Sequence, residues 1–251
     1  MSPRLSPYTS HSRDSSRDPS RGPSRSPSRS PASPSISEIT PGLFIGTFED
    51  SKDIKTLMHN SITAIVTLCR RRAPEWDRAG NRMLVAPENH LVVPCADMPD
   101  EDLLSKFPKL CDFIESRLHP PPPTLASVLS KGPSGRGGML DGLEDWDTTE
   151  YFASHNVLVH CNQGVSRSAT VVAAYLMRKT GQSREACLEV MKRKRKVRPI
   201  ESFMEQLGIW EEVRYELWEE DGEGGRRPKE AYRRWLEKVG GRGEECRKMG
   251  E

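Results

Sequence analysis

An apolar run that ends in a cysteine carries the clearest chemical signal in this sequence. Val157-Leu-Val159 leads into His160-Cys161, and Arg167-Ser168 follows after a short stretch that contains Gly164. Residues of these types fit a tight loop between a strand and a helix, whose backbone N–H groups point inward and bind an anion. An arginine holds two oxygens of a phosphate group at once, and together with a helix N-terminus it lowers the pKa of a thiol. The segment therefore predicts a phosphate-binding loop in which the Cys161 thiolate attacks phosphorus in line.

Each part of this pattern also has an ordinary structural explanation. A single cysteine is most often a small buried hydrophobic residue, and a glycine-containing turn between a strand and a helix is common in α/β folds. Here, however, several defined positions coincide, which are His160, Cys161, Gly164, Ser166, Arg167 and Ser168. Their coincidence favours a functional loop.

The pattern His-Cys-x-x-Gly-x-x-Arg-Ser resembles the signature of the protein tyrosine phosphatase superfamily, and its surroundings resemble the dual-specificity branch. Three further segments are similar to that branch, which are the opening strand and turn at Ile39–Gly46, the acid loop at Cys95–Leu103 and the closing helix around Phe203–Leu207. The resemblance covers about residues 38–118 and 155–220. It implies a cysteine-based protein phosphatase that needs no metal or other cofactor.

The resemblance also implies a role for each residue of the site. Cys161 would form a phosphocysteine intermediate, and Asp97 would protonate the leaving alcohol and then activate water. Ser168 would stabilise the thiolate as it leaves, and His160 would orient the loop. The phosphoryl oxygens would be held by the loop residues Asn162, Gln163, Gly164, Val165, Ser166 and Arg167.

The choice of the acid depends on spacing. Asp100, Glu101 and Asp102 lie close to Asp97, and acidic residues in loops are usually just solvated. The spacing typical of the branch selects Asp97 over Asp100.

One departure from the branch concerns the support of the loop. Dual-specificity members commonly carry Pro-Asn before the Phe of the closing helix, whereas this chain has Pro199-Ile200. Because that Asn normally helps to brace the active-site loop, we expect the bracing to differ or to be weaker here.

The elements that must position this loop follow from the hydrophobic pattern. Strands are predicted at Leu43–Ile45, Ile62–Leu68, His90–Cys95 and Val157–Val159. Helices are predicted at Asp50–Asn60, Leu103–Leu118, Ala169–Met177 and Ser202–Glu219. Gly181 is expected to end the third helix, and Ser183 to cap another. This alternation predicts an α/β domain with a short, largely parallel central sheet flanked by helices.

Three segments fall outside the pattern. Residues 1–36 are rich in Ser, Arg and Pro and are expected to be a disordered tail. This tail is either simply solvated, phosphorylated by proline-directed kinases, or a targeting signal. A low-complexity insertion spans 119–154, and a polar C-terminal extension at 221–251 holds one further short helix at Pro228–Val239. The dual-specificity phosphatase domain is then expected at 37–220.

Composition limits the partners and the compartment. The net charge is +2, with 38 Lys and Arg against 36 Asp and Glu, so nucleic acid is not expected as a partner. No apolar run approaches about 18 residues, so no membrane span is expected. The six cysteines form no C-x-x-C pair, which argues against a zinc site and a disulfide framework and favours a cytoplasmic or nuclear location.

The substrate stays open from the sequence. Phosphoproteins are expected, modified on tyrosine and also on serine or threonine. One alternative is a phosphoinositide, a glucan or an RNA 5′ end, although Asn162, Gln163 and Val165 stand where phosphoinositide phosphatases tend to have lysines. Another is a phosphate-binding module with little turnover, although such proteins usually lose the Cys, the Arg or the acid.

Two further features carry weaker hypotheses. Lys192–Arg198 is strongly basic, and we interpret it first as a solvated helix end, and second as a nuclear address or an attraction for acidic substrates. Cys69 ends a strand that would lie beside the catalytic one. By resemblance to some superfamily members, it is a hypothetical redox partner of Cys161.

Overall fold

The computed structural model describes residues 36–120, 155–222 and 224–248. Residues 1–35 of the expected disordered tail and most of the expected insertion lie outside the described residues, whereas Ile36, expected to end the tail, is buried in the core.

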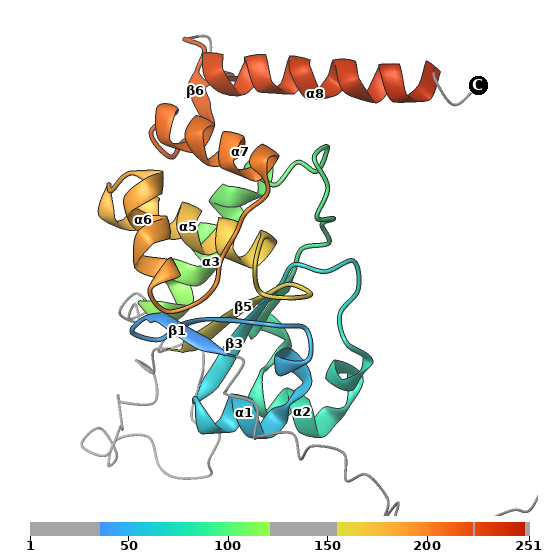
Figure 1. Cartoon of the computed structure of the whole chain (residues 1–251), viewed down its shortest axis with the longest axis vertical. Helices are drawn as coiled ribbons and strands as arrows, with labels where there is room; N and C mark the ends of the chain where they lie inside the picture. Colours follow the sequence, from blue (N-terminus) through green and yellow to red (C-terminus); the bar gives the residue numbers. More distant parts are fainter. Residues whose placement is uncertain (1–35, 121–154, 223, 249–251) are drawn as a thin grey trace, which may run out of the picture. The chain divides into compact units, whose positions relative to one another are not determined.

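A five-stranded sheet forms the centre of the fold (Figure 1). Its strands lie in the order β1-β2-β5-β3-β4 and are β1 (Ser37–Thr40), β2 (Leu43–Gly46), β3 (Ile62–Thr67), β4 (His90–Val92) and β5 (Asn156–His160). β5 pairs in parallel with both β2 and β3, and β4 continues the parallel set, whereas β1 is antiparallel to β2. The largely parallel sheet predicted from the sequence is therefore confirmed.

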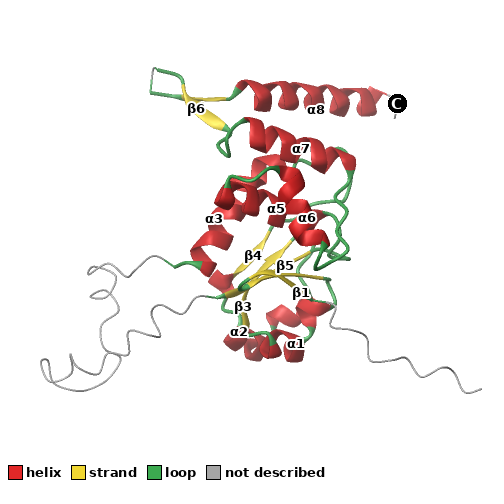
Figure 2. Cartoon of the chain, turned by 60° about the vertical axis from the view of Figure 1, so that its left-hand side comes forward, coloured by secondary structure: helices red, strands yellow, loops and turns green. Residues whose placement is uncertain are grey.

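Helices cover both faces of this sheet (Figure 2). One face carries α3 (Phe107–Leu118), α5 (Arg167–Thr180), α6 (Arg184–Lys192) and α7 (Glu201–Glu212), and the other carries α1 (Ile54–His59) and α2 (Ala79–Leu84). Short 3₁₀ helices complete the connections, at η1 (Asp50–Lys52), η2 (Pro74–Asp77), η3 (Pro87–Asn89) and η4 (Leu104–Lys106).

The apolar runs of the strands are explained by burial on both faces. Along β5, Val157 and Val159 pack into the core under α3 and α5, whereas Leu158 packs into a second core with Trp76 and Leu57. Successive side chains of a strand point to opposite faces, so a strand covered on both sides must be apolar throughout. The predicted caps are also present, since Gly181 ends α5 with φ 68° and the Ser183 hydroxyl accepts from the Ala186 amide at the start of α6.

Several predicted element bounds were wrong. The helix expected to reach Glu219 ends at Glu212, because Arg214 and Tyr215 adopt positive φ angles of 56° and 62° and turn the chain. Leu217 still reaches the core, but from outside the helix.

Two elements in the N-terminal half of the chain are also shorter than expected. The expected helix at Asp50–Asn60 is divided into η1 and α1, with Asp53 capping α1 through the Lys55 amide. The strand expected to reach Cys95 ends at Val92, two residues before Pro94, which has no N–H to donate.

The chain after residue 220 is part of the folded structure rather than only a polar extension. β6 (Trp218–Glu220) and β7 (Arg226–Pro228) form a hairpin that crosses the expected boundary, and α8 (Glu230–Lys248) is longer than the expected short helix. α8 packs against α7 (Figure 2) and buries three side chains in the common core, Ala231, Tyr232 and Trp235. These three residues lie on one face of the helix, but the segment around them is polar, so the sequence pattern did not predict that the helix packs on the core. None of the helices in the described ranges is long and apolar enough to cross a bilayer.

Trp235→Ala is expected to lower the free energy of unfolding by about 3 kcal/mol or more, because it empties a buried indole site. The matched control is Trp218→Ala, since Trp218 is 38% exposed and its loss should cost about 1 kcal/mol or less. Urea unfolding of both variants measures the difference. Equal midpoints for the two would show that α8 does not contribute to the core.

Candidate active site

The predicted phosphate loop connects β5 to α5 at the carboxyl end of the parallel strands. Cys161 follows the last residue of β5, and Arg167 is the first residue of α5. The Cys161 side chain is only 1% exposed, and its Sγ lies 3.4 Å from the Ser168 hydroxyl. The carboxyl edge of such a sheet is where α/β folds bind ligands.

The surroundings of Cys161 favour its thiolate. Burial by itself raises the pKa of this thiol, but hydrogen bonds from the Ser168 hydroxyl and amide, the charge of Arg167 and the Val165 amide outweigh it and hold the pKa below its ordinary value. Burial raises the pKa of four other cysteines, to about 11 for Cys69 and about 12 for Cys95 and Cys111, and in direction also for Cys187. Of these five cysteines, Cys161 is thus the one best suited to act as a nucleophile.

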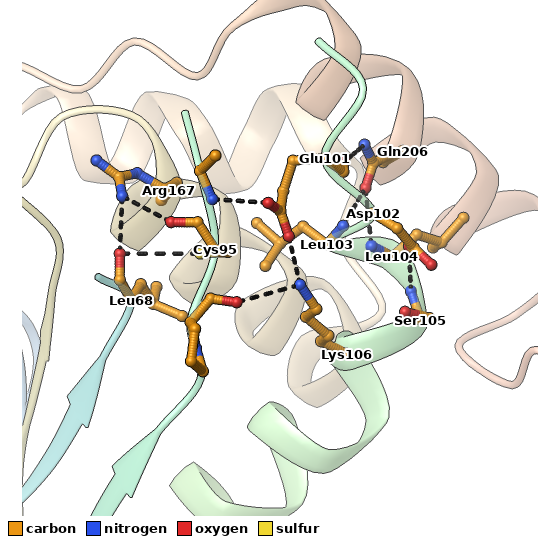
Figure 3. A network of polar contacts seen from close by, with 12 residues as sticks. Leu68, Cys95, Glu101, Asp102, Leu103, Leu104, Ser105, Lys106, Arg167 and Gln206 are labelled. Atoms are coloured by element: carbon orange, nitrogen blue, oxygen red, sulfur yellow. Dashed lines mark hydrogen bonds and ion pairs between the residues drawn. The ribbon is translucent and has the colours of Figure 1, made fainter. Parts of the chain in front are cut away.

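Arg167 is held so that part of its guanidinium stays available. Its Nη1 donates to the carbonyl oxygens of Leu68 and Cys95, both at 3.0 Å (Figure 3). Its Nε is buried without a hydrogen-bond partner among the described residues. A buried donor that lacks a partner is costly, so this Nε is suited to a phosphate oxygen.

Asp97 lies at the same loop. The Ser166 hydroxyl donates to Oδ1 of Asp97 at 2.7 Å, and Oδ2 lies 3.7 Å from Nε of Arg167. Two of the neighbouring acids have other partners, since Glu101 accepts from the Ala96 amide and Asp102 accepts from the Ser105 amide. Of the acids weighed from the sequence, the structure thus brings Asp97 to the phosphate loop.

His160 is fully buried behind the nucleophile. Its Nε2 lies 2.8 Å from the Thr67 hydroxyl and its Nδ1 lies 3.5 Å from the Cys161 carbonyl oxygen. Burial is the main cause that lowers its pKa to about 4, and the charge of Arg167 acts in the same direction. The ring is therefore neutral near pH 7.

Known proteins are similar to this chain in sequence and in fold. Residues 151–213 match the family described as dual specificity phosphatase, catalytic domain. Human dual specificity protein phosphatase 15 is 30% identical over 171 residues, which are 67% of this chain but 43% of that protein. Mouse (Mus musculus) dual specificity protein phosphatase 22 is 31% identical over 195 residues, which are 75% of this chain and 83% of that protein. This chain belongs to the dual specificity phosphatase family.

A solved structure supports the same assignment. The crystal structure of a mouse putative dual specificity phosphatase complexed with zinc tungstate is 28% identical and has a TM-score of 0.50, covering 73% of this chain and 91% of that one. The family's members are protein phosphatases, and the resemblance read from the sequence is confirmed.

In this family member, Gln206 of α7 fixes the end of the acid loop. Its side-chain oxygen accepts from the Leu103 and Leu104 amides at 2.9 and 2.7 Å, and its nitrogen donates to the Glu101 carbonyl at 2.9 Å (Figure 3). Glu101 in turn pairs with Lys106. The closing helix thereby sets the base of the loop that carries Asp97.

Arg195 is a supporting residue that the sequence analysis missed. It lies in the basic segment interpreted as solvated, yet it is half-buried, and its Nε donates to the Gly164 carbonyl at 2.8 Å while Nη2 donates to the Gln163 carbonyl at 3.2 Å. Gly164 itself has φ 64°, and a Cβ added there would lie 2.5 Å from the Gly46 carbonyl oxygen, so only glycine fits. Ile200 stands where the family commonly has an Asn that supports the loop, and this departure was the sequence signal that another residue must support it.

Arg195→Ala is expected to lower kcat/KM on a small aryl phosphate about 10- to 100-fold, because two carbonyls of the phosphate loop lose their donor and the loop shifts. Lys196→Ala is the matched control, since Lys196 is exposed in the same segment and should change the rate little. Equal rates for the two variants would show that Arg195 does not support the loop.

Cys69 also contacts the phosphate loop. Its thiol donates to the Asn162 side-chain oxygen at 3.2 Å, and both Cys69 and Cys161 are free thiols. The position is compatible with the redox hypothesis, which stays a hypothesis.

Proposed function

We propose that this chain removes phosphate from tyrosine, and also from serine and threonine, in proteins through a phosphocysteine intermediate. The proposal is carried by three groups that lie together at the loop. They are a cysteine with a lowered pKa, an arginine whose buried Nε has no hydrogen-bond partner among the described residues, and Asp97.

The first step would transfer the phosphoryl group to sulfur. The Cys161 thiolate attacks phosphorus, the S–P bond forms and the P–O bond to the substrate breaks. Arg167 and the loop amides hold the phosphoryl oxygens as charge builds on them. Asp97 gives its proton to the leaving oxygen, so the product departs as a neutral alcohol or phenol.

The second step would hydrolyse this intermediate. Asp97, now a carboxylate, takes a proton from water, and the water oxygen attacks phosphorus as the S–P bond breaks. The sulfur leaves as a thiolate, which the Ser168 hydroxyl at 3.4 Å stabilises by donating a hydrogen bond. Inorganic phosphate is released, and the enzyme returns to its starting state.

Activity toward both aromatic and aliphatic esters is supported by the exposure of the loop and by the relatives. Asn162 and Gln163, which follow the nucleophile, are exposed, so a phosphate on a short side chain can approach the loop. The relatives described above carry the name dual specificity phosphatase.

The first test is hydrolysis of p-nitrophenyl phosphate with a chelator present, followed by three peptides that differ only in phosphotyrosine, phosphoserine or phosphothreonine. We expect turnover of all four, with vanadate as an inhibitor. Turnover of phosphotyrosine without the other two peptides would limit the specificity to tyrosine. No turnover at all, with tungstate still bound, would identify a phosphate-binding module instead.

Asp97→Asn separates the acid from the other groups. We expect about a 100-fold loss or more on the phosphoserine peptide, because an alkoxide is a poor leaving group and needs the proton, and a smaller loss on p-nitrophenyl phosphate. An equal loss on both substrates would argue against Asp97 as the general acid.

A further inference from the structure

A line of polar side chains runs from α2 through β4 and β3 to the phosphate loop. Nη1 of Arg82 lies 3.4 Å from Nδ1 of His90, and Nε2 of His90 lies 2.8 Å from the Thr67 hydroxyl. The same hydroxyl lies 2.8 Å from Nε2 of His160, whose Nδ1 faces the Cys161 carbonyl oxygen at 3.5 Å. In the sequence, His90 was only the first residue of a predicted strand, and neither it nor Arg82 was assigned to the site.

The donors along this line can be assigned from one end. A guanidinium only donates hydrogen bonds, so Nδ1 of His90 must accept from Arg82. A neutral His90 then carries its proton on Nε2 and donates it to the Thr67 oxygen. The Thr67 hydroxyl has one hydrogen, and beyond His90 its hydrogen-bond partner among the described residues is Nε2 of His160, so it gives the hydrogen to that nitrogen. His160 must therefore carry its proton on Nδ1, toward the Cys161 carbonyl.

This assignment requires both rings to be neutral, and their surroundings favour that. His160 is fully buried and His90 is 8% exposed. Burial is the main cause that lowers the pKa of His90 to about 3, and the groups facing it (Arg82, His160 and Arg72) act in the same direction. The remaining side of the ring is covered by Trp76, edge-on at 5.2 Å between ring centroids.

We propose that His90 and Arg82 are positioning residues that fix the proton of His160 on Nδ1 and so orient the peptide group of the nucleophile. A hydrogen bond into the Cys161 carbonyl holds the backbone from which the phosphate loop starts. It also directs the positive end of an N–H dipole toward the nucleophile, which favours the thiolate. The effect on turnover rests on the proposed function, whereas the proton positions do not.

The proton positions can be measured without any substrate. In the full-length protein labelled with ¹⁵N in histidine, we expect the ring nitrogen shifts to show His160 protonated at Nδ1 and His90 protonated at Nε2. His160→Gln and His90→Gln assign the signals. A proton on Nε2 of His160 would overturn the proposal.

The effect on the nucleophile can be measured by the rate of Cys161 alkylation by iodoacetamide against pH, followed by mass spectrometry. His90→Met removes the donor to Thr67, and the midpoint of the alkylation profile should rise by about half to one pH unit. His90→Gln keeps an amide that accepts from Arg82 and donates to Thr67, so it should restore the wild-type profile. The other titratable groups that interact with Cys161 are unchanged in these variants, namely Arg167, Arg195, Cys69 and Cys95.

Two controls separate positioning from packing. Trp76→Phe changes the packing beside His90 and should lower the unfolding midpoint without moving the alkylation profile. Thr67→Val should shift the profile as His90→Met does, and the double variant should shift it no further, because both break one line of hydrogen bonds. If His90→Met and His90→Gln shift the profile equally, or if the two shifts add, His90 acts only through packing and the proposal fails.

Discussion

Cys161→Ser is expected to lose turnover by a factor on the order of 10⁴ or more while still binding a phosphate analogue. A serine hydroxyl is not ionised by the groups that hold the pKa of the Cys161 thiol low, so the attacking anion is absent. The Arg167 side chain stays fixed by the Leu68 and Cys95 carbonyls, and the loop amides are unchanged. Turnover of p-nitrophenyl phosphate and calorimetric titration with tungstate measure the two properties separately.

Cys187→Ser is the matched control for this variant. Cys187 is also a buried cysteine, 2% exposed, but it lies in α6 and has a raised pKa. We expect its replacement to leave kcat within about twofold of wild type, with at most a modest loss of stability. Turnover retained in Cys161→Ser would exclude Cys161 as the nucleophile, and loss of tungstate binding would show that the variant had disturbed the loop itself.

Arg167→Lys is expected to lower kcat/KM about 1,000-fold, although the positive charge is kept. The guanidinium binds two carbonyl oxygens through Nη1 and still presents a buried Nε toward the site. A lysine has one compact ammonium group at the end of a flexible stem and cannot make both sets of bonds. Steady-state kinetics and tungstate titration should show that kcat falls more than analogue binding does, because the planar fork matters most when charge develops on the phosphoryl oxygens.

A lysine at another position of the same helix provides the control. Arg178 also lies in α5 and pairs with Asp112 at 2.8 Å on the surface, so Arg178→Lys should leave the kinetics unchanged. If Arg167→Lys keeps more than about a tenth of the wild-type kcat/KM, a point charge is sufficient and the fork has no special role.

The core of the fold was predictable because burial on both faces leaves a strong pattern in the sequence. Ile62–Leu68 and Val157–Val159 are largely apolar runs rich in β-branched residues, and in the structure they form most of the neighbouring strands β3 and β5. The end of α7 could not be predicted, because Arg214 and Tyr215 have positive φ angles there, and arginine and tyrosine rarely adopt such angles. The packing of α8 was hidden for a different reason, because few apolar residues in a polar segment give a weak signal.

Some residues of the candidate site could also be recognised from the sequence, and others could not. Cys161, Arg167 and Ser168 lie on one short turn, so their proximity follows from the local chain alone. Arg195 could not be recognised, because its contact with the loop depends on how the chain returns after α6. His90 could not be connected to His160 either, because the contact requires β3 to lie between β4 and β5 in the sheet.

The position of β5 in the middle of the sheet has a consequence for how the protein is made. β5 pairs with β2 and β3, yet it is the last of these strands to leave the ribosome. Until then, β2 and β3 each present an edge with no native partner, and exposed strand edges recruit other chains. Pairing across such long separations is also slow. The newly synthesised chain should therefore be most prone to aggregation just before β5 emerges, and the same strand that delivers Cys161 should end that vulnerable period.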